Sequence, residues 1–146
     1  MSQYLSLSSL ETKRIGRELA KKVLELSRKN KKAIIIGLKG ELGGGKTTFL
    51  QAFASGLGIK EKILSPTFVI YRRYKIKDGN FYHFDCYRIK KSEEMVSLGF
   101  NKIIKEEGSI IALEWADKIR EIMPSDSIWV NFSFLKEKER KIIVNI

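Results

Sequence analysis

The chain has 146 residues, of which 43% are apolar and 31% are charged, a composition typical of one globular domain with a buried core. This length leaves no room for a separate substrate domain, so we expect residues 1–146 to form a single domain. No apolar run approaches the roughly 18 residues of a membrane span, and the N-terminal residues lack the basic and then apolar pattern of a secretion signal. We therefore expect a cytoplasmic protein without membrane contact.

The charge balance and the cysteine content narrow the possible functions. With 28 Lys and Arg against 17 Asp and Glu, the formal net charge is +11, which favours an anionic partner such as RNA. The basic residues are spread along the chain, and the densest run, residues 28–32, follows a predicted helix whose carboxyl end attracts cations anyway. A nucleic-acid contact and a solvated surface both stay open. Cys86 is the single cysteine, which excludes an internal disulfide and a cysteine-rich metal site.

The first predicted element is an amphipathic helix. Ser8 and Glu11 have the spacing of a capping box, and Ile15, Leu19 and Val23 then recur at helical spacing. This pattern predicts a helix that packs one face against the core.

A glycine-rich loop follows between a predicted strand and a second helix. Residues 33–38 form an apolar run typical of a buried strand, and residues 47–57 carry apolar side chains on one helical face. The sequence between them, GELGGGKT at residues 40–47, fits the phosphate-loop pattern G-x-x-x-x-G-K-[ST]. Glycines let backbone N–H groups surround a phosphate, and the helix directs its positive end at the same point. This segment predicts a nucleotide-binding site.

The phosphate loop assigns roles to individual residues. We expect Lys46 to bind the β- and γ-phosphates, Thr47 to bind Mg²⁺ through its hydroxyl, and Thr48 to contact the α-phosphate. The remaining residues expected to line the nucleotide are Glu41, Leu42, Gly43, Gly44 and Gly45.

The rest of the chain predicts a sheet of mixed direction. Strands are predicted at residues 68–76, 80–87, 109–114, 128–134 and 142–146. Short helices are predicted at residues 93–98, with Ser92 as the cap, and at residues 102–107 and 117–123. The order of elements predicts an α/β, three-layer P-loop nucleotide-binding fold. Its mixed, mostly parallel sheet carries antiparallel hairpins and has helices on both faces.

Hydrolysis requires an acid near Mg²⁺ and a group that orients the attacking water. Asp85 and Glu114 each follow an apolar strand, and ligands gather at the carboxyl ends of strands in α/β sheets. Thr67, in a loop before the hairpin, has the position of a γ-phosphate sensor. The alternatives are turn or helix capping for the two acids and a structural role for Thr67. For His83 we expect a packed or hydrogen-bonded role, and for Trp115 either a core position or one beside the nucleotide.

Four segments together resemble one known family. GELGGGKTT, SPTF, YHFDCYRI and LEWAD, in this order and at this spacing, are similar to the bacterial TsaE family, the small ATPases of tRNA threonylcarbamoyladenosine synthesis. The similarity extends from Leu10 to the final hairpin. It implies an ATPase that binds ATP and Mg²⁺ and acts with a TsaD-like transferase subunit and a TsaB-like scaffold, with tRNA contacted indirectly.

The resemblance also implies roles at single positions. It places Asp85 and Glu114 at the metal and the attacking water, Thr67 in a mobile switch loop, and Thr12 near the bound nucleotide. The chain departs from the family at Gly44, where alanine is usual, and at Cys86, where leucine is usual.

Three other function classes remain as alternatives. A switch GTPase is disfavoured because residues 85–88 lack the glycine of D-x-x-G and no Asn-Lys-x-Asp segment is present. A small-molecule kinase needs an acceptor pocket and a lid, and no insertion is long enough to supply both. The third alternative is a basic RNA-binding module without enzymatic activity.

Overall fold

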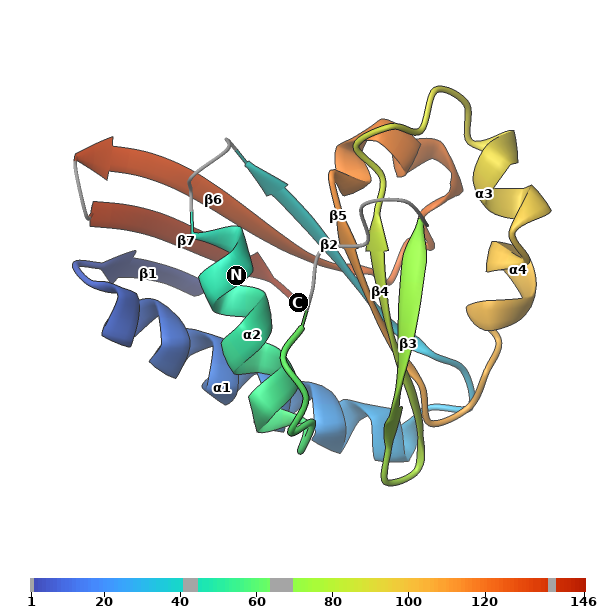
Figure 1. Ribbon diagram of the computed structural model, residues 1–146, viewed down its shortest axis with the longest axis horizontal. Helices are drawn as coiled ribbons and strands as arrows, with labels where there is room; N and C mark the ends of the chain where they lie inside the picture. The colour runs from blue at the N-terminus through green and yellow to red at the C-terminus, as the bar shows by residue number, and fades with distance from the viewer. Residues whose placement is uncertain (1, 41–44, 64–69, 137–138) are drawn as a thin grey trace.

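The computed structural model describes residues 2–40, 45–63, 70–136 and 139–146. These residues form a sheet covered by helices on both faces (Figure 1). The strands are β1 (Ser2–Ser6), β2 (Ile34–Gly40), β3 (Tyr71–Ile76), β4 (Gly79–Asp85), β5 (Ile110–Glu114), β6 (Ile128–Lys136) and β7 (Glu139–Asn145). The helices are α1 (Ser9–Lys29), α2 (Lys46–Gly56), α3 (Glu93–Ser97), α4 (Phe100–Ile103) and the 3₁₀ helix η1 (Ala116–Ile122). No helix among the described residues is both long and apolar enough to span a bilayer.

The sheet has a parallel centre and antiparallel borders. Its strand order within the described residues is β1-β7-β6-β2-β5-β4-β3. Strand β2 pairs in parallel with β6 and β5, and β5 pairs in parallel with β4. The hairpin β3–β4 and the β6–β7 pair are antiparallel, as is the pairing of β1 with β7. This arrangement confirms the predicted α/β fold, in which antiparallel hairpins are attached to a parallel centre.

Each face of the sheet has its own apolar core. Helices α1 and α2 cover one face, where Phe49, Phe53 and Phe132 are buried against the strands. Helices α3, α4 and η1 cover the other face, where Phe84 and Phe100 pack together. A strand buried on both faces reads as a continuous apolar run, which is why β4 and β5 show little alternation in the sequence.

The predicted capping box is present at the start of α1. Ser8 Oγ accepts a hydrogen bond from the backbone N–H of Glu11 at 3.2 Å, and the Glu11 carboxylate accepts from Leu7 N–H at 3.2 Å. The helix then packs closely on α2, because Gly16 has no side chain: a Cβ there would lie 2.8 Å from the carbonyl oxygen of Phe49. This close contact fixes the position of α2, whose first turn belongs to the predicted phosphate loop.

Three local predictions differ from the structure. Strand β1 was not predicted, because its pairing partner β7 lies at the other end of the sequence. Ser92 does not cap α3 with its side chain; its hydroxyl donates instead to the carboxylate of Glu121. Helix α4 is a single turn that begins after Gly99, which has a left-handed φ of 85°, and is anchored by the buried Phe100. Residues 102–107 are therefore only partly helical.

Candidate functional site

The site lies at the edge of the sheet where β2, β4 and β5 end. Gly40 closes β2 with φ 140°, and a Cβ at this position would lie 2.3 Å from the carbonyl oxygen of Phe132. Gly45 precedes α2 in a left-handed conformation (φ 90°), as the glycine-rich pattern requires. Five of the predicted site residues lie outside the described part of the chain, so their roles remain predictions; they are Glu41, Leu42, Gly43, Gly44 and Thr67.

The first turn of α2 is suited to bind an anion. No side chain among the described residues caps it, and it contains no acidic residue. Its backbone N–H groups and the positive end of the helix dipole are therefore available to a ligand. Thr47 is exposed in this turn and Thr48 is half-buried, and their roles at Mg²⁺ and at the α-phosphate stay predictions.

Lys46 is a nearly buried cation at the start of α2, only 6% exposed. Its Nζ donates a hydrogen bond to the carbonyl oxygen of Gly40 at 3.1 Å and lies 4.1 Å from the centre of the Trp115 ring. Burial lowers the pKa of Lys46, and the negative charges of Glu114 and Asp85 partly oppose this effect. The lysine forms no ion pair with a carboxylate of the described residues. It is therefore a desolvated charge that an anionic ligand would stabilise.

Asp85 and Glu114 lie opposite each other on neighbouring parallel strands. They are register partners at the ends of β4 and β5, so the structure brings together the two acids predicted from separate segments. One Asp85 oxygen accepts a hydrogen bond from Tyr87 N–H at 3.0 Å, which is the turn-capping contact considered as the alternative. Its second oxygen accepts no hydrogen bond from the described residues. Both carboxylates are only partly buried and can be reached by a ligand.

His83 contacts Glu114 directly. Its Nε2 lies 2.8 Å from Oε2 of Glu114, and the two side chains are 3% and 13% exposed. The prediction of a hydrogen-bonded histidine is therefore confirmed, and its partner is one of the two candidate catalytic acids.

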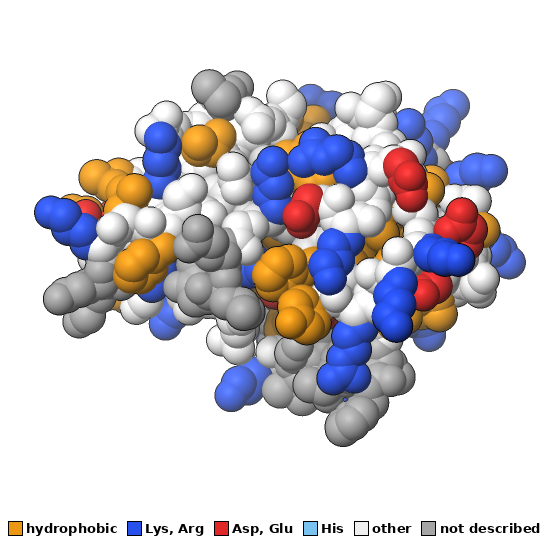
Figure 2. All heavy atoms as spheres, turned by 90° about the horizontal axis from the view of Figure 1, so that it is seen from above, with side chains coloured by type: hydrophobic (Ala, Val, Ile, Leu, Met, Phe, Trp, Pro, Cys, Tyr) orange, Lys and Arg blue, Asp and Glu red, His pale blue; other side chains and the backbone are white. Residues whose placement is uncertain are grey.

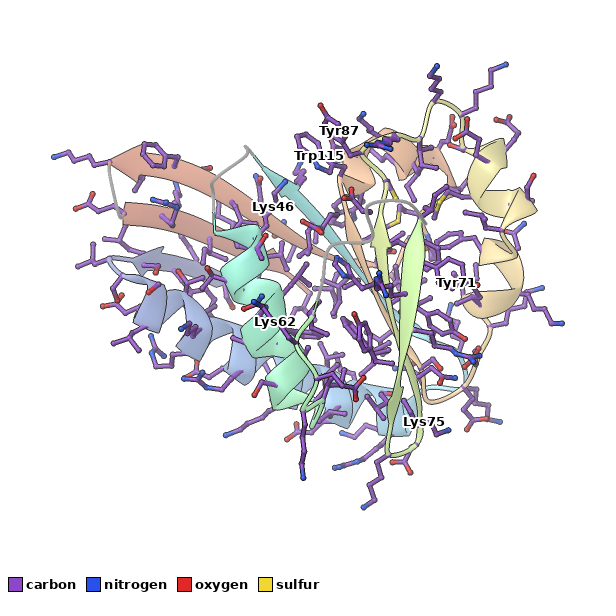
Figure 3. The ribbon with its side chains drawn as sticks, viewed as in Figure 1. Lys46, Lys62, Tyr71, Lys75, Tyr87 and Trp115 are labelled. Carbon is purple, nitrogen blue, oxygen red and sulfur yellow. The ribbon has the colours of Figure 1, made fainter. Side chains whose placement is uncertain are left out.

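Trp115 is partly buried: it packs against the apolar core on the α3–α4 face and also lies beside Lys46. It is the one non-glycine residue with positive φ in the described part of the chain, at 58°, a conformation uncommon for a bulky residue. Its ring packs on the exposed Tyr87 with ring centres 5.2 Å apart, and Lys118 lies 4.8 Å from the centre of the Tyr87 ring. Figure 3 shows Lys46, Trp115 and Tyr87 at the same end of the sheet. The sequence had left both positions of Trp115 open.

A second part of the site lies between the start of α1 and the start of α2. A cavity of about 280 Å³ is lined by Ser8, Ser9, Thr12, Gly45, Thr48 and Arg140. The Thr12 hydroxyl is buried and lies 2.6 Å from Ser6 Oγ. Thr12 thus borders Gly45 and the start of α2, and its place near the bound nucleotide stays a prediction.

Comparison with known proteins decides the family. Residues 7–142 match the family model described as "Threonylcarbamoyl adenosine biosynthesis protein TsaE". The chain is 35% identical over 121 residues to the tRNA threonylcarbamoyladenosine biosynthesis protein TsaE of Haemophilus influenzae, covering 83% of this chain and 75% of that protein. It is 36% identical over 108 residues to the TsaE protein of Bacillus subtilis, covering 74% and 66% of the two chains. The chain belongs to the TsaE family.

A solved structure agrees with this assignment. The crystal structure of YdiB from Bacillus subtilis superimposes with a TM-score of 0.73 at 29% identity, covering 97% of this chain and 82% of that one. The resemblance predicted from four short segments is therefore confirmed over nearly the entire chain. The TsaE family takes part in the biosynthesis of threonylcarbamoyladenosine in tRNA.

The TsaE-family site has the donors that Mg²⁺ prefers, but not a complete protein cage. Carboxylate oxygens of Asp85 and Glu114 and the hydroxyl of Thr47 are hard oxygen ligands. Among the described residues no group of three or more His, Cys, Asp or Glu side chains is arranged to hold a metal ion. Mg²⁺ sites can use one or two carboxylates together with substrate phosphates and water, and Mg²⁺ at this site stays a prediction.

Two residues of the TsaE-family site were missed by reasoning from the sequence. Arg140 reaches the cavity from β7, and its Cγ and Nε lie 3.9 and 4.0 Å from the position of a Cβ at Gly45. Its guanidinium also lies 4.6 Å from the centre of the Phe134 ring. Tyr87 was not predicted to pack on Trp115. Arg140 belongs to no recognised motif and reaches the site only through the pairing of distant strands. Tyr87 lies within the segment YHFDCYRI, but nothing in that segment indicates its contact with Trp115.

Proposed function

We propose that the chain is a Mg²⁺-dependent ATPase that supports threonylcarbamoyl modification of adenosine in tRNA. One observation carries the proposal: an uncapped helix start with a buried lysine lies at the same sheet edge as two carboxylates on adjacent strands. A phosphate chain with its metal ion needs these two kinds of group together, amides and a cation for its oxygens and carboxylates for the metal.

The residues divide the work by their chemistry. Lys46 and the first-turn amides of α2 would hold the phosphates, with Thr48 adding a hydroxyl. Thr47, Asp85 and Glu114 would hold Mg²⁺, directly or through water. Bound Mg²⁺ would neutralise charge on the β- and γ-phosphate oxygens. Glu114 would also accept a hydrogen bond from the attacking water and so fix its direction toward the γ-phosphate.

The cavity beside Thr12 is suited to the rest of the nucleotide. It adjoins Thr48, the residue expected at the α-phosphate, and it carries hydroxyl and guanidinium donors from Ser8, Ser9, Thr12 and Arg140. Hydroxyl groups of a ribose and nitrogen atoms of a base are partners for such donors. We place the nucleoside there, on the side of α2 that faces α1.

Partner proteins are expected to raise the rate of ATP hydrolysis. Arg140 lies beside Gly45 and Thr48 in the cavity lining, which contains neither Asp85 nor Glu114. An arginine at the γ-phosphate supplied by another protein accelerates related reactions about 10³- to 10⁵-fold. We therefore propose that TsaD-like and TsaB-like proteins complete the site.

On the face seen in Figure 2, basic side chains are interspersed with acidic and apolar ones, which favours an indirect role for tRNA.

The test is ATP hydrolysis by the pure protein, alone and with its TsaD-like and TsaB-like partners. We expect slow release of inorganic phosphate by the protein alone and a marked increase when both partners are present. Competition of GTP against ATP in the same assay tests the GTPase alternative. Full activity without partners, or phosphate transfer to a small acceptor, would contradict the proposal.

Replacing Asp85 by Asn should chiefly raise the Mg²⁺ concentration needed for activity. Asparagine keeps an oxygen that accepts from Tyr87 N–H, so the turn after β4 should survive, while the charge that attracts the cation is lost. Titration of activity with Mg²⁺ at saturating ATP measures the effect, with Asp78→Asn in the distant β3–β4 turn as the control. An unchanged Mg²⁺ requirement would remove Asp85 from the metal site.

A further inference from the structure

His83 is buried within β4, and its ring contacts the carboxylate of Glu114. It lies within β4 on the strand face that also carries Phe81 and Asp85, and it is 2% exposed. Its Nε2 lies 2.8 Å from Oε2 of Glu114, whereas Nδ1 is buried and has no hydrogen-bond partner among the described residues. A buried nitrogen without a partner costs free energy. An apolar residue would therefore pack at lower cost, and packing alone does not account for the histidine.

His83 and Glu114 contact each other although they are not register partners on β4 and β5. His83 is the register partner of Ala112, and Glu114 is the register partner of Asp85. The Glu114 side chain therefore reaches diagonally across the two strands, toward the residue two positions before its own register partner, to contact His83. A contact made this way holds one rotamer of Glu114. It fixes Oε2 and leaves Oε1 for other partners.

We propose that His83 is a positioning residue for Glu114. The His83 Nε2–H donates a hydrogen bond to Oε2 of Glu114 and so orients Oε1 of Glu114 toward the water beside the metal. This role rests on the proposed ATPase function. Residues that hydrogen-bond to the ligands of a metal site fix the orientation of those ligands in this way, and replacing such residues lowers activity about 10- to 100-fold. His83 itself does not touch the substrate in this proposal.

The first test detects the hydrogen bond without any activity measurement. The chain contains one histidine, so ¹⁵N labelling of histidine gives one imidazole spectrum. We expect a proton on Nε2 that exchanges slowly with water, and we expect its chemical shift to change in Glu114→Ala. An unprotonated Nε2 would overturn the proposal, because the hydrogen bond to the carboxylate would lack its donor.

The second test separates positioning from structure with two substitutions of the same residue. His83→Leu keeps the apolar volume and removes the donor, and we expect kcat with partners to fall about 10- to 100-fold while KM for ATP stays within about threefold. His83→Gln places an amide N–H near the position of Nε2, and we expect kcat within about threefold of the parent. Loss of activity in the leucine variant with recovery in the glutamine variant identifies the donor as the cause.

Two controls make this result specific. Phe81→Leu changes a buried residue two positions earlier on the same strand face and should leave kcat nearly unchanged. In a Glu114→Gln background, His83→Leu should cause little further loss, because the two residues act as one unit. A leucine variant with the parent kcat, or leucine and glutamine variants that lose kcat equally, would overturn the positioning role. An inactive parent with partners present would instead overturn the proposed ATPase function, and the NMR result would still report the pair.

Discussion

Replacing Glu114 by Gln is expected to lower ATP turnover in the presence of partners by about 10² or more, while ATP affinity stays within about tenfold. Glutamine keeps the size of the side chain and an oxygen that can accept from His83 Nε2. It removes the negative charge at the end of β5, where the carboxylate is 13% exposed and little screened by water. The effect should therefore appear in kcat rather than in binding.

The measurement is steady-state phosphate release together with nucleotide binding to the same protein. Glu106→Gln is a matched control, because the Glu106 carboxylate accepts hydrogen bonds from Asn80, Tyr82 and Ser109 at the opposite end of β4 and β5. That variant should lose stability but not kcat. If Glu114→Gln hydrolyses ATP at the parent rate with partners present, the chemistry must be assigned to Asp85.

The second large effect is expected for Lys46→Ala, which should lower ATP affinity by about 10²- to 10³-fold. The lysine would contribute charge-assisted hydrogen bonds to phosphate oxygens, each worth about 1.5–3 kcal/mol. The fold should tolerate the change, because burial already disfavours the charged form of Lys46, as its lowered pKa indicates. Removing a desolvated charge relieves that cost. We expect the thermal unfolding temperature to be unchanged or slightly raised.

Calorimetry tests the expected loss of ATP affinity. Circular dichroism tests the expected thermal unfolding temperature. Lys75→Ala is the control, because Lys75 lies at the other end of the molecule on β3 (Figure 3). Equal ATP affinity in Lys46→Ala and the parent would remove the lysine from the phosphate site. A collapse of the fold in Lys46→Ala would show that its contacts with Gly40 and Trp115 are structural.

The local features of the fold were predictable because each is encoded within a few residues. The capping box at Ser8 and Glu11 is a contact across three residues, and the hairpin turn at Asp78 and Gly79 joins two adjacent strands. The strand, glycine loop and helix around Lys46 likewise follow one another directly. Such signals depend on backbone preferences and hydrogen bonds that a short segment satisfies by itself.

The contacts that complete the site were not predictable in the same way. His83 and Glu114 are 31 residues apart, and Arg140 reaches Gly45 from the last strand. Strand order and register decide these contacts, and neither is written in a local pattern. The two acids were found because both end apolar strands, a rule that holds for the whole class of folds. Their hydrogen-bond partners required the packed sheet.

The pairing of β1 with β7 has a consequence for the order in which the protein folds. Ser2–Ser6 pair with residues 140–144, so the outer strand has no partner until the C-terminal strand is in place. Contacts between segments so distant in sequence carry a large loop-closure cost and form slowly. Ser6 Oγ contacts the Thr12 hydroxyl at 2.6 Å, and Arg140 of β7 lines the same cavity. The wall of the cavity assigned to the nucleoside is thus assembled late, and a nucleotide that binds it stabilises the completed sheet by mass action.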